Sequence, residues 1–233
     1  MNKLKSGIEA FDQLLDGGFP EGRSYLISGE PGTGKTIFCL QFLLEGVRQG
    51  KKGLYICIDE RPEHIIADAA SLGWNILPHL ENKDIQLVDI TTHFLPKADQ
   101  PVNTDSVIGF IIDLVRSQNI GRMAIDPIAP LVFSSMTSPE ANEYIRKLIF
   151  AIEDDLNCTT LLTSYIPVGS DKVSHHGIEE FAASGIILLK LTKLNNKFIR
   201  TIRLRKMRAT KIDLTEYSFD ILPNRGIVIR QPI

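Results

Sequence analysis

The stretch of sequence that decides the fold is Gly29-Glu30-Pro31-Gly32-Thr33-Gly34-Lys35-Thr36. It satisfies every position of the pattern G-x-x-x-x-G-K-[ST], and it lies between an apolar run, 24–28, and a helical pattern, 35–49. Such a loop curls its backbone N–H groups around phosphates at the N-terminus of a helix. We expect this stretch, with Ile37 directly after it, to hold ATP. Lys35 would reach the β- and γ-phosphates, and the Thr36 hydroxyl would ligate Mg²⁺.

Strand-like and helix-like segments alternate on both sides of this loop, a pattern typical of a parallel sheet with crossover helices. The strand-like runs are 54–58, 85–89, 122–125 and 159–163, and the helix-like segments are 8–15, 63–72, 105–118 with Thr104 as cap, and 138–156 with Ser138 as N-cap. Two later runs, 185–193 and 197–206, have hairpin spacing. We therefore expect an α/β fold with a mostly parallel central sheet flanked by helices, ending in an antiparallel hairpin, as one domain over residues 1–233.

Composition narrows the class of protein. With 26 basic and 28 acidic residues the net charge is −2, so the whole-molecule field gives no reason to expect a polyanion partner. No signal peptide opens the sequence and no apolar run approaches the ~20 residues that span a bilayer, which predicts a cytoplasmic protein with no membrane partner. The cysteines, Cys39, Cys57 and Cys158, lack metal or redox spacing and are expected to be small core residues.

Three carboxylates follow strand-like runs. Asp126 is the natural magnesium ligand, because ligands bind at the carboxyl ends of parallel strands, although an acid there can also simply cap a turn. Asp59 and Glu60 repel each other unless a cation or a water uses them, so one of them is the candidate that orients the attacking water. A solvated acidic turn before Pro62 is the alternative.

A basic stretch begins at residue 190 and ends at residue 211. Most of its cations are expected to form a solvated strand face. Within it, Lys206 and Arg208 flank Met207 and point to the same face of a strand, about 7 Å apart. Two such cations can sense a phosphate, either in the same chain or from a neighbouring subunit.

Taken together, these residues resemble the KaiC-type branch of the RecA superfamily of ATPases. The resemblance covers nearly the whole chain. It rests on 6–8, 16–22, the phosphate loop, Asp59-Glu60-Arg61-Pro62, Ser71-Leu72-Gly73-Trp74, Asp126, Gly177-Ile178-Glu179-Glu180-Phe181 and Lys206-Met207-Arg208-Ala209-Thr210.

The resemblance implies a RecA-like core that assembles into a homo-oligomeric ring, typically a hexamer, with ATP at each subunit interface. In such a ring Lys206 and Arg208, in the segment that also holds Met207 and Thr210, would reach the γ-phosphate bound by the next subunit. It further places Ser71, Leu72 and Trp74 near the nucleoside, Thr163-Ser164 at the strand end that senses the phosphate state, and the catalytic carboxylates on Asp59 and Glu60.

Three departures from the family pattern bear on function. Asp59 stands where the family usually has a glutamate, so its shorter carboxylate predicts slow turnover. Ile212 occupies a position where clock KaiC proteins usually carry a histidine near the nucleotide. Glu179 and Glu180 align with the phosphoacceptor Ser-Thr pair of the clock proteins and cannot accept a phosphoryl group. We therefore expect an ATPase without self-phosphorylation.

Several functions remain open at this stage. The first is a regulatory ATPase ring that acts on protein partners. The second is a DNA-repair ATPase that binds single strands through loops around 134–138 and 165–180, but those loops offer few cations and aromatic platforms. The third is a nucleotide-binding module that does not hydrolyse. His175-His176 could in principle bind a metal, although no third ligand is evident.

Overall fold

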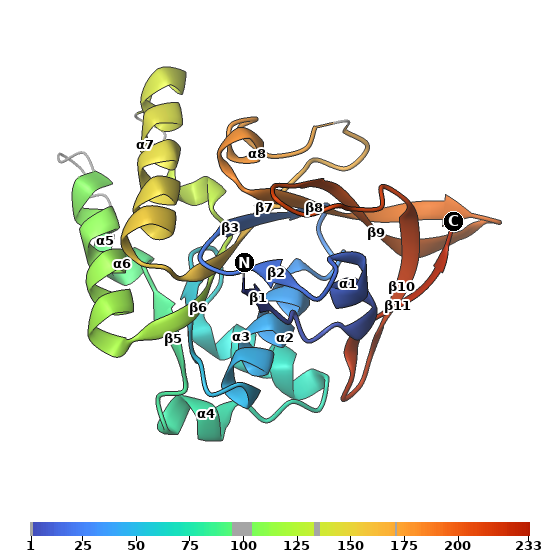
Figure 1. Cartoon of the computed structure of the whole chain (residues 1–233), viewed down its shortest axis with the longest axis horizontal. Helices are drawn as coiled ribbons and strands as arrows, with labels where there is room; N and C mark the ends of the chain where they lie inside the picture. The colour runs from blue at the N-terminus through green and yellow to red at the C-terminus, as the bar shows by residue number, and fades with distance from the viewer. Residues whose placement is uncertain (1, 95–103, 133–135, 171) are drawn as a thin grey trace.

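The computed structural model describes residues 2–94, 104–132, 136–170 and 172–233 (Figure 1). In this part of the chain the centre is a nine-stranded sheet in the order β11-β10-β9-β8-β3-β7-β6-β4-β5. From β8 to β5 in that order the neighbours are parallel, and from β8 to β11 they are antiparallel. The strands are β3 Ser24–Gly29, β4 Lys52–Cys57, β5 Ile85–Asp89, β6 Ile120–Asp126, β7 Thr159–Tyr165, β8 Gly185–Leu194, β9 Lys197–Met207, β10 Glu216–Leu222 and β11 Gly226–Pro232, with a small β1–β2 pair at Lys3–Leu4 and Phe19–Pro20.

Helices cover both faces of this sheet. They are α1 Glu9–Leu14, α2 Lys35–Arg48, α3 Pro62–Ser71, α4 Leu77–Glu81, α5 Thr91–Phe94, α6 Thr104–Gln118, α7 Ser138–Phe150 and α8 Glu179–Ala182. The alternation of side chains along β3 explains the layers, because Tyr25 and Ile27 join a core cluster with α1, α2 and α3, whereas Leu26 joins another with α6 and α7. The predicted α/β class, with a mostly parallel sheet that ends antiparallel, is confirmed.

The C-terminal end departs from the sequence prediction. Beyond the predicted hairpin β8–β9, a second hairpin, β10–β11, extends the sheet, with β10 paired to β9. Its turn reaches back over the molecule, since the backbone N–H of Asn224 donates to the carbonyl of Leu72 at 2.6 Å. The C-terminal strands are therefore part of the surroundings of α2 and α3 (Figure 1).

Two predicted helix caps are wrong, and the last part of one predicted helix has π-helical form. The N-cap of α7 is Thr137, not Ser138, because Thr137 and Glu140 form a reciprocal capping box. The α-helix ends at Phe150 and continues as one π-helical stretch, Ala151–Asp155. Thr104, expected as a cap, is already part of α6.

Among the described residues, no helix combines the length and the apolar character needed to cross a bilayer.

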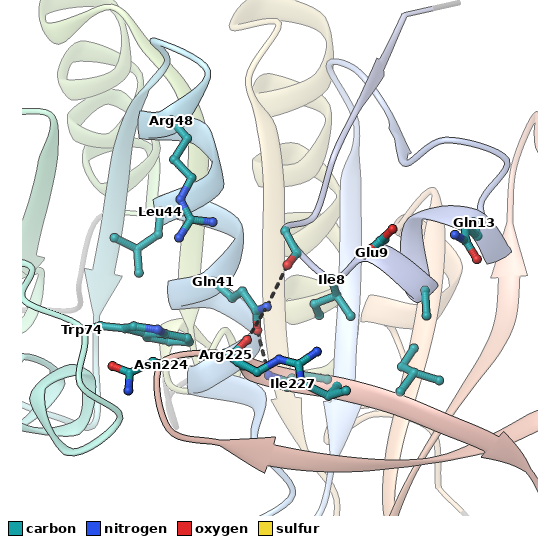
Figure 2. A pocket seen from close by; sticks show the side chains of 14 residues that line it. Ile8, Glu9, Gln13, Gln41, Leu44, Arg48, Trp74, Asn224, Arg225 and Ile227 are labelled. Carbon is teal, nitrogen blue, oxygen red and sulfur yellow. Dashed lines mark hydrogen bonds between the residues drawn. The ribbon is translucent and has the colours of Figure 1, made fainter.

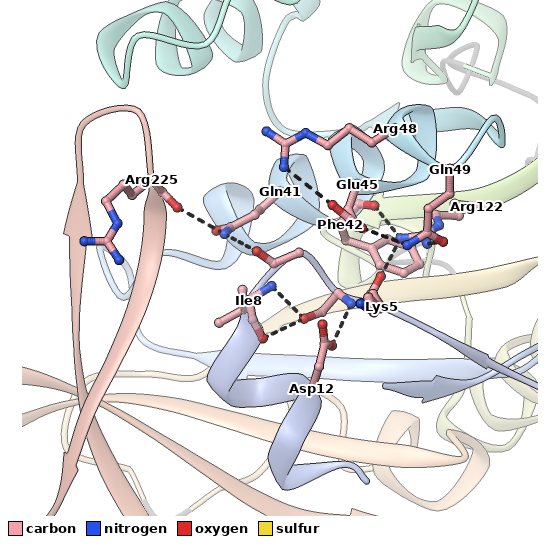
Figure 3. A network of polar contacts seen from close by, with 12 residues as sticks. Lys5, Ile8, Asp12, Gln41, Phe42, Glu45, Arg48, Gln49, Arg122 and Arg225 are labelled. Atoms are coloured by element: carbon pink, nitrogen blue, oxygen red, sulfur yellow. Dashed lines mark hydrogen bonds and ion pairs between the residues drawn. The ribbon is translucent and has the colours of Figure 1, made fainter. Parts of the chain in front are cut away.

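A buried arginine connects the N-terminal segment to the sheet and to α2 (Figure 3). Arg122 at the start of β6 is completely buried. Its guanidinium donates to the carbonyls of Lys5 at 2.7 Å and Phe42 at 2.8 Å, and to the Gln49 side chain at 2.8 Å. Burial lowers its pKa to about 10, against the raising effect of nearby carboxylates such as Glu45. The side chain of Arg122 therefore joins the N-terminal segment, α2 and β6 through its hydrogen bonds.

Candidate functional site

The phosphate loop joins the end of β3 to the start of α2. Gly32 and Gly34 have φ values of 77° and 101°, a conformation that suits glycine. A Cβ at Gly34 would lie 2.8 Å from the Cδ1 of Ile221 on β10, so a side chain there would also collide with the C-terminal hairpin. The loop can therefore turn its backbone N–H groups inward at the N-terminus of a helix, which is the arrangement that binds phosphate.

Lys35 begins α2 with its ammonium turned back over the loop. Its Nζ donates to the carbonyls of Gly29 at 2.9 Å and Glu30 at 3.0 Å. Burial lowers the pKa of Lys35, and the negative charge of Asp126 opposes that shift. The ammonium is thus partly desolvated and close to the place where phosphate would lie, which strengthens its attraction for an anion.

Asp126 lies at the end of β6 and is the hydrogen-bonding centre of the site. One carboxylate oxygen accepts from the Thr36 hydroxyl at 2.9 Å and from the Tyr55 hydroxyl, and the other accepts from the Thr163 hydroxyl. The structure therefore brings together the two residues that sequence reasoning assigned to magnesium. A hydroxyl and a carboxylate in this arrangement suit a hard cation that keeps most of its waters.

Tyr55 is a contact that sequence reasoning missed. It lies on β4, the strand next to β6, and burial followed by the charge of Asp126 raises its pKa well above the usual tyrosine range. It therefore stays protonated and donates to Asp126. The available signal was a polar tip in the middle of an apolar strand that neighbours the one ending in Asp126.

Asp59 and Glu60 follow β4, whose last residue, Cys57, pairs with Asp126. Both side chains are exposed, and neither makes a side-chain hydrogen bond within the described part of the chain. Partial burial, and then the charge of Asp126, raise the pKa of each carboxyl above its ordinary value. The structure therefore brings both acids to the same end of the parallel strands as the phosphate loop.

The segment expected near the nucleoside lies against the β10–β11 turn. A Cβ at Gly73 would lie 2.2 Å from the Asn224 side chain, and one at Gly226 would lie 2.6 Å from Trp74. Ser71 donates to the carbonyl of Asp68 at 2.7 Å. Ile37, in the first turn of α2, packs against the core cluster of that face. Leu72 and Trp74 thus lie beside the hairpin whose Ile221 approaches the phosphate loop.

Lys206, Met207 and Arg208 lie far from the phosphate loop of their own chain. Met207 pairs with Gly185, which pairs with Tyr25 near the start of β3, whereas the loop follows Gly29 at its end. At about 3.3 Å per residue, the two places are roughly 13 Å apart along the strand. The structure does not bring these cations to the predicted site within one chain.

The two cations instead hold the end of α8. Lys206 Nζ donates to the carbonyls of Ala183 at 2.7 Å and Glu180 at 3.0 Å, and Arg208 donates to that of Phe181 at 3.4 Å. Burial, followed by the charge of Arg208, lowers the pKa of Lys206. Thr210 has a buried hydroxyl without a hydrogen-bond partner among the described residues.

Arg200 is a second residue that sequence reasoning missed, because its pattern is that of a solvated strand face. Its Nε donates to the carbonyl of Gly32 at 3.2 Å, and β9 places it opposite Phe219 of β10. A cation therefore touches the phosphate loop from the same chain. Only the tertiary pairing of β9 and β10 identifies it among its basic neighbours.

The polar loop between β7 and α8 lies against the same site. The backbone N–H of Gly169 donates to Glu30 at 3.1 Å, and Ser164 accepts from the N–H of His175 at 3.0 Å. Glu179 is completely buried and accepts from the N–H of Ile178 at 3.1 Å. Among the described residues, no cluster of metal-ligating side chains includes the two histidines. Residues 133–135 and 171, in the two loops considered for DNA, lie outside the described residues.

The phosphate loop between β3 and α2, together with the Thr36–Asp126 pair, defines a RecA-like P-loop nucleotide-binding protein. A family model described as "ATPase: KaiC" matches residues 4–232. The chain belongs to this KaiC ATPase family.

Similar proteins agree with this assignment. A KaiC-like protein of Pyrococcus horikoshii OT3 has a crystal structure that superposes with a TM-score of 0.86 at 34% identity, covering 99% of both chains. A UPF0273 protein of Methanocaldococcus jannaschii is 32% identical over 98% of this chain and 96% of its own length. The circadian clock protein KaiC3 of Synechocystis is 30% identical over 98% of this chain, which spans 46% of that clock protein.

Proposed function

We propose that this protein binds ATP with Mg²⁺ and hydrolyses it slowly as a single-domain, cytoplasmic KaiC-like ATPase that assembles into a ring. Asp126 and Thr36 would hold the magnesium ion, and Lys35 would neutralise the β- and γ-phosphates. Asp59 or Glu60 would orient the attacking water. Family membership supports nucleotide binding, and the hydrogen bond between Thr36 and Asp126 supports the metal assignment.

The observation that carries the ring is the placement of Lys206 and Arg208. They lie at the opposite end of the parallel strands from the phosphate loop, so they can serve a phosphate only in another subunit. Exposed Phe181, at 74% of its full accessible area, lies on α8, whose carbonyls hold both cations. A ring would place Lys206, Arg208 and Phe181 against the nucleotide of the next subunit. Its hexameric size and its regulatory protein partners remain expectations from the resemblance.

The first test measures phosphate release from purified protein with Mg²⁺ and ATP, with and without single-stranded DNA. Lys35→Ala serves as the control for contaminating ATPases. We expect slow release that depends on Lys35 and is indifferent to DNA. Release that persists in Lys35→Ala, or none in the wild type, contradicts hydrolysis at this site.

Nucleic-acid binding remains a second candidate because the outer part of the β8–β9 hairpin is basic. Lys193 and Lys197 are exposed next to the turn, and neither forms an ion pair within the described part of the chain. Strong stimulation of phosphate release by DNA, lost at higher salt, would favour this function.

We also propose that the protein does not phosphorylate itself. Phosphate incorporated into a peptide from residues 164–184 would contradict this absence of self-phosphorylation.

A further inference from the structure

A cavity of about 440 Å³ lies where four segments meet (Figure 2). Its walls come from the segment before and within α1, the outward face of α2, Trp74 and the start of β11. No residue of the phosphate loop lines it. Strand β10 approaches the phosphate loop through Ile221, whereas residues of β11 line the cavity. The two strands of this hairpin therefore lie between the phosphate loop and the cavity. The volume falls within the range of about 300–1,000 Å³ that small-molecule sites occupy.

Gln41 keeps the walls of this cavity in place. Its amide nitrogen donates to the carbonyls of Gly7 at 2.8 Å and Arg225 at 3.2 Å, and its amide oxygen accepts from the N–H of Ile227 at 2.9 Å. One side chain thus holds the N-terminal segment and β11 against α2 (Figures 2 and 3). The cavity is therefore formed before any ligand arrives, which reduces the cost of binding.

Two arginines give the cavity its charge. Arg225 lies at the β10–β11 turn, and within the described part of the chain its guanidinium has no hydrogen bond or ion pair. Arg48, near the end of α2, meets only Glu45 at 3.5 Å, and its side chain is 70% exposed. Glu9 is the single acid among the lining residues, and Arg225 is the cation that pairs with no carboxylate in the described part of the chain. A free guanidinium fork favours a planar, multidentate anion such as phosphate or carboxylate.

Trp74 supplies a flat part of the cavity wall (Figure 2). It packs against Gly226, where a Cβ would lie 2.6 Å from its ring, and its indole N–H has no hydrogen-bond partner among the described residues. Leu44, Ile8 and Ile227 provide an apolar lining beside it. An aromatic face near guanidinium groups binds flat rings by stacking.

We propose that this cavity binds a compact anion that carries a flat ring, of the size of a nucleoside monophosphate. The anionic group would lie with Arg225 and Arg48, and the ring would lie against Trp74. The site is separate from the phosphate loop, since Arg48 is about 20 Å from Lys35 along α2 at 1.5 Å per residue. Helix α2 starts at the end of the phosphate loop and also lines the cavity. A ligand in the cavity would therefore contact the same helix that carries Lys35 and Thr36.

The test uses the fluorescence of Trp74, which is the only tryptophan of the chain. Adenosine monophosphate is titrated into the wild type, with adenosine and inorganic phosphate as probes that carry only the ring or only the anion. We expect saturable quenching by the monophosphate, with each part binding at least about tenfold more weakly. Equal binding by adenosine alone, or no saturable quenching, overturns the proposal.

Two variants and a competitor separate this cavity from the phosphate loop. Arg225→Ala, at an exposed position, should weaken binding of adenosine monophosphate by about tenfold or more, the usual effect of losing a charge-assisted contact. Lys52→Ala removes an exposed cation at the start of β4 and should change nothing. Saturating the phosphate loop beforehand with a non-hydrolysable ATP analogue and Mg²⁺ should leave the quenching by adenosine monophosphate intact. If the analogue abolishes the quenching while Arg225→Ala does not, the nucleotide occupies the phosphate loop and the proposed site is wrong. ATP hydrolysis is not needed for either outcome.

Discussion

The Thr36 hydroxyl donates a 2.9 Å hydrogen bond to the carboxylate of Asp126, although 90 residues separate them in the sequence. Thr36 lies in the first turn of α2, which follows β3, and Asp126 ends β6; β3 and β6 are not neighbours, because β7 lies between them. The same carboxylate oxygen also accepts from Tyr55 of β4, and Thr163 of β7 donates to the other. Side chains from the start of α2 and from two strands, β4 and β7, therefore meet at one carboxylate at the end of β6.

Asp126→Asn should abolish magnesium-dependent hydrolysis. The amide lacks the charge that a divalent cation requires, and we expect a loss on the order of a hundredfold or more in kcat. A magnesium titration of phosphate release measures it. Tyr55→Phe is the matched variant, because it removes a donor and leaves the charge, so its effect should be much smaller. Equal losses in both variants would contradict a metal-binding role for Asp126.

Two inactive variants should restore activity when they are mixed. Lys35→Ala lacks a working phosphate loop and keeps Arg208, whereas Arg208→Ala has the opposite defect. If Arg208 serves the next subunit, mixed rings contain some interfaces in which both residues are intact. Phosphate release from the mixture, after subunit exchange, should exceed that of either variant alone. A mixture no more active than its components contradicts a shared site.

Arg200→Ala should weaken ATP binding. Its guanidinium contacts the Gly32 carbonyl in the phosphate loop, so its loss removes a cation beside the phosphates. We expect a Kd about tenfold higher, measured by titration calorimetry. Arg203→Ala is the matched control, because Arg203 lies on the same strand with its side chain on the opposite face. Similar effects of both substitutions would indicate a general charge effect instead of a contact.

Arg122→Met should destabilise the fold. Two backbone carbonyls and the Gln49 side chain lose their donor in a completely buried place. We expect a loss of about 2–4 kcal/mol in the free energy of unfolding, measured with urea. Arg116→Met, on the exposed side of α6, should change it by less than about 0.5 kcal/mol. A loss below about 1 kcal/mol for Arg122→Met would contradict its structural role.

The acid limb of hydrolysis should lie above the ordinary carboxyl range. The pKa values of Asp59 and Glu60 are raised by partial burial and by Asp126, so each stays protonated to a higher pH than a free carboxyl, near 4. A protonated carboxyl cannot accept a hydrogen bond from water through that oxygen, so activity should fall as pH decreases through the raised pKa. Profiles of Asp59→Asn and Glu60→Gln identify the group, since the limb should disappear with the one that orients water.

The central part of the fold could be predicted because its signals are local. The phosphate loop, its flanking strand and helix, and the strand ending at Asp126 are all readable from short patterns. The β10–β11 hairpin also has a local signal, since residues 216–222 alternate apolar and polar side chains before a turn. At α7, the spacing from Thr137 to Glu140 identifies the cap that Ser138 was expected to supply.

The contacts of the site were harder to predict where they depend on strand order. Tyr55 meets Asp126 only because β4 and β6 are neighbours. Arg200 touches Gly32 only because β9 and β10 fold against the phosphate loop. Arg200 does not differ in local pattern from the other cations of its strand, and the polar tip of Tyr55 does not by itself show which carboxylate it meets. Their roles emerge from sheet topology, which a single sequence does not reveal.

The placement of phosphate loop and cations at opposite ends of the same parallel strands has a consequence for counting active sites. In an assembly built on this contact, every complete site needs two adjacent subunits in a fixed head-to-tail order. A closed ring of n subunits contains n complete sites, whereas an open row of n contains only n − 1, with unused cations at one end and an unassisted nucleotide at the other. The activity per subunit would therefore rise when an open row closes into a ring, and the rise would be largest for assemblies of few subunits.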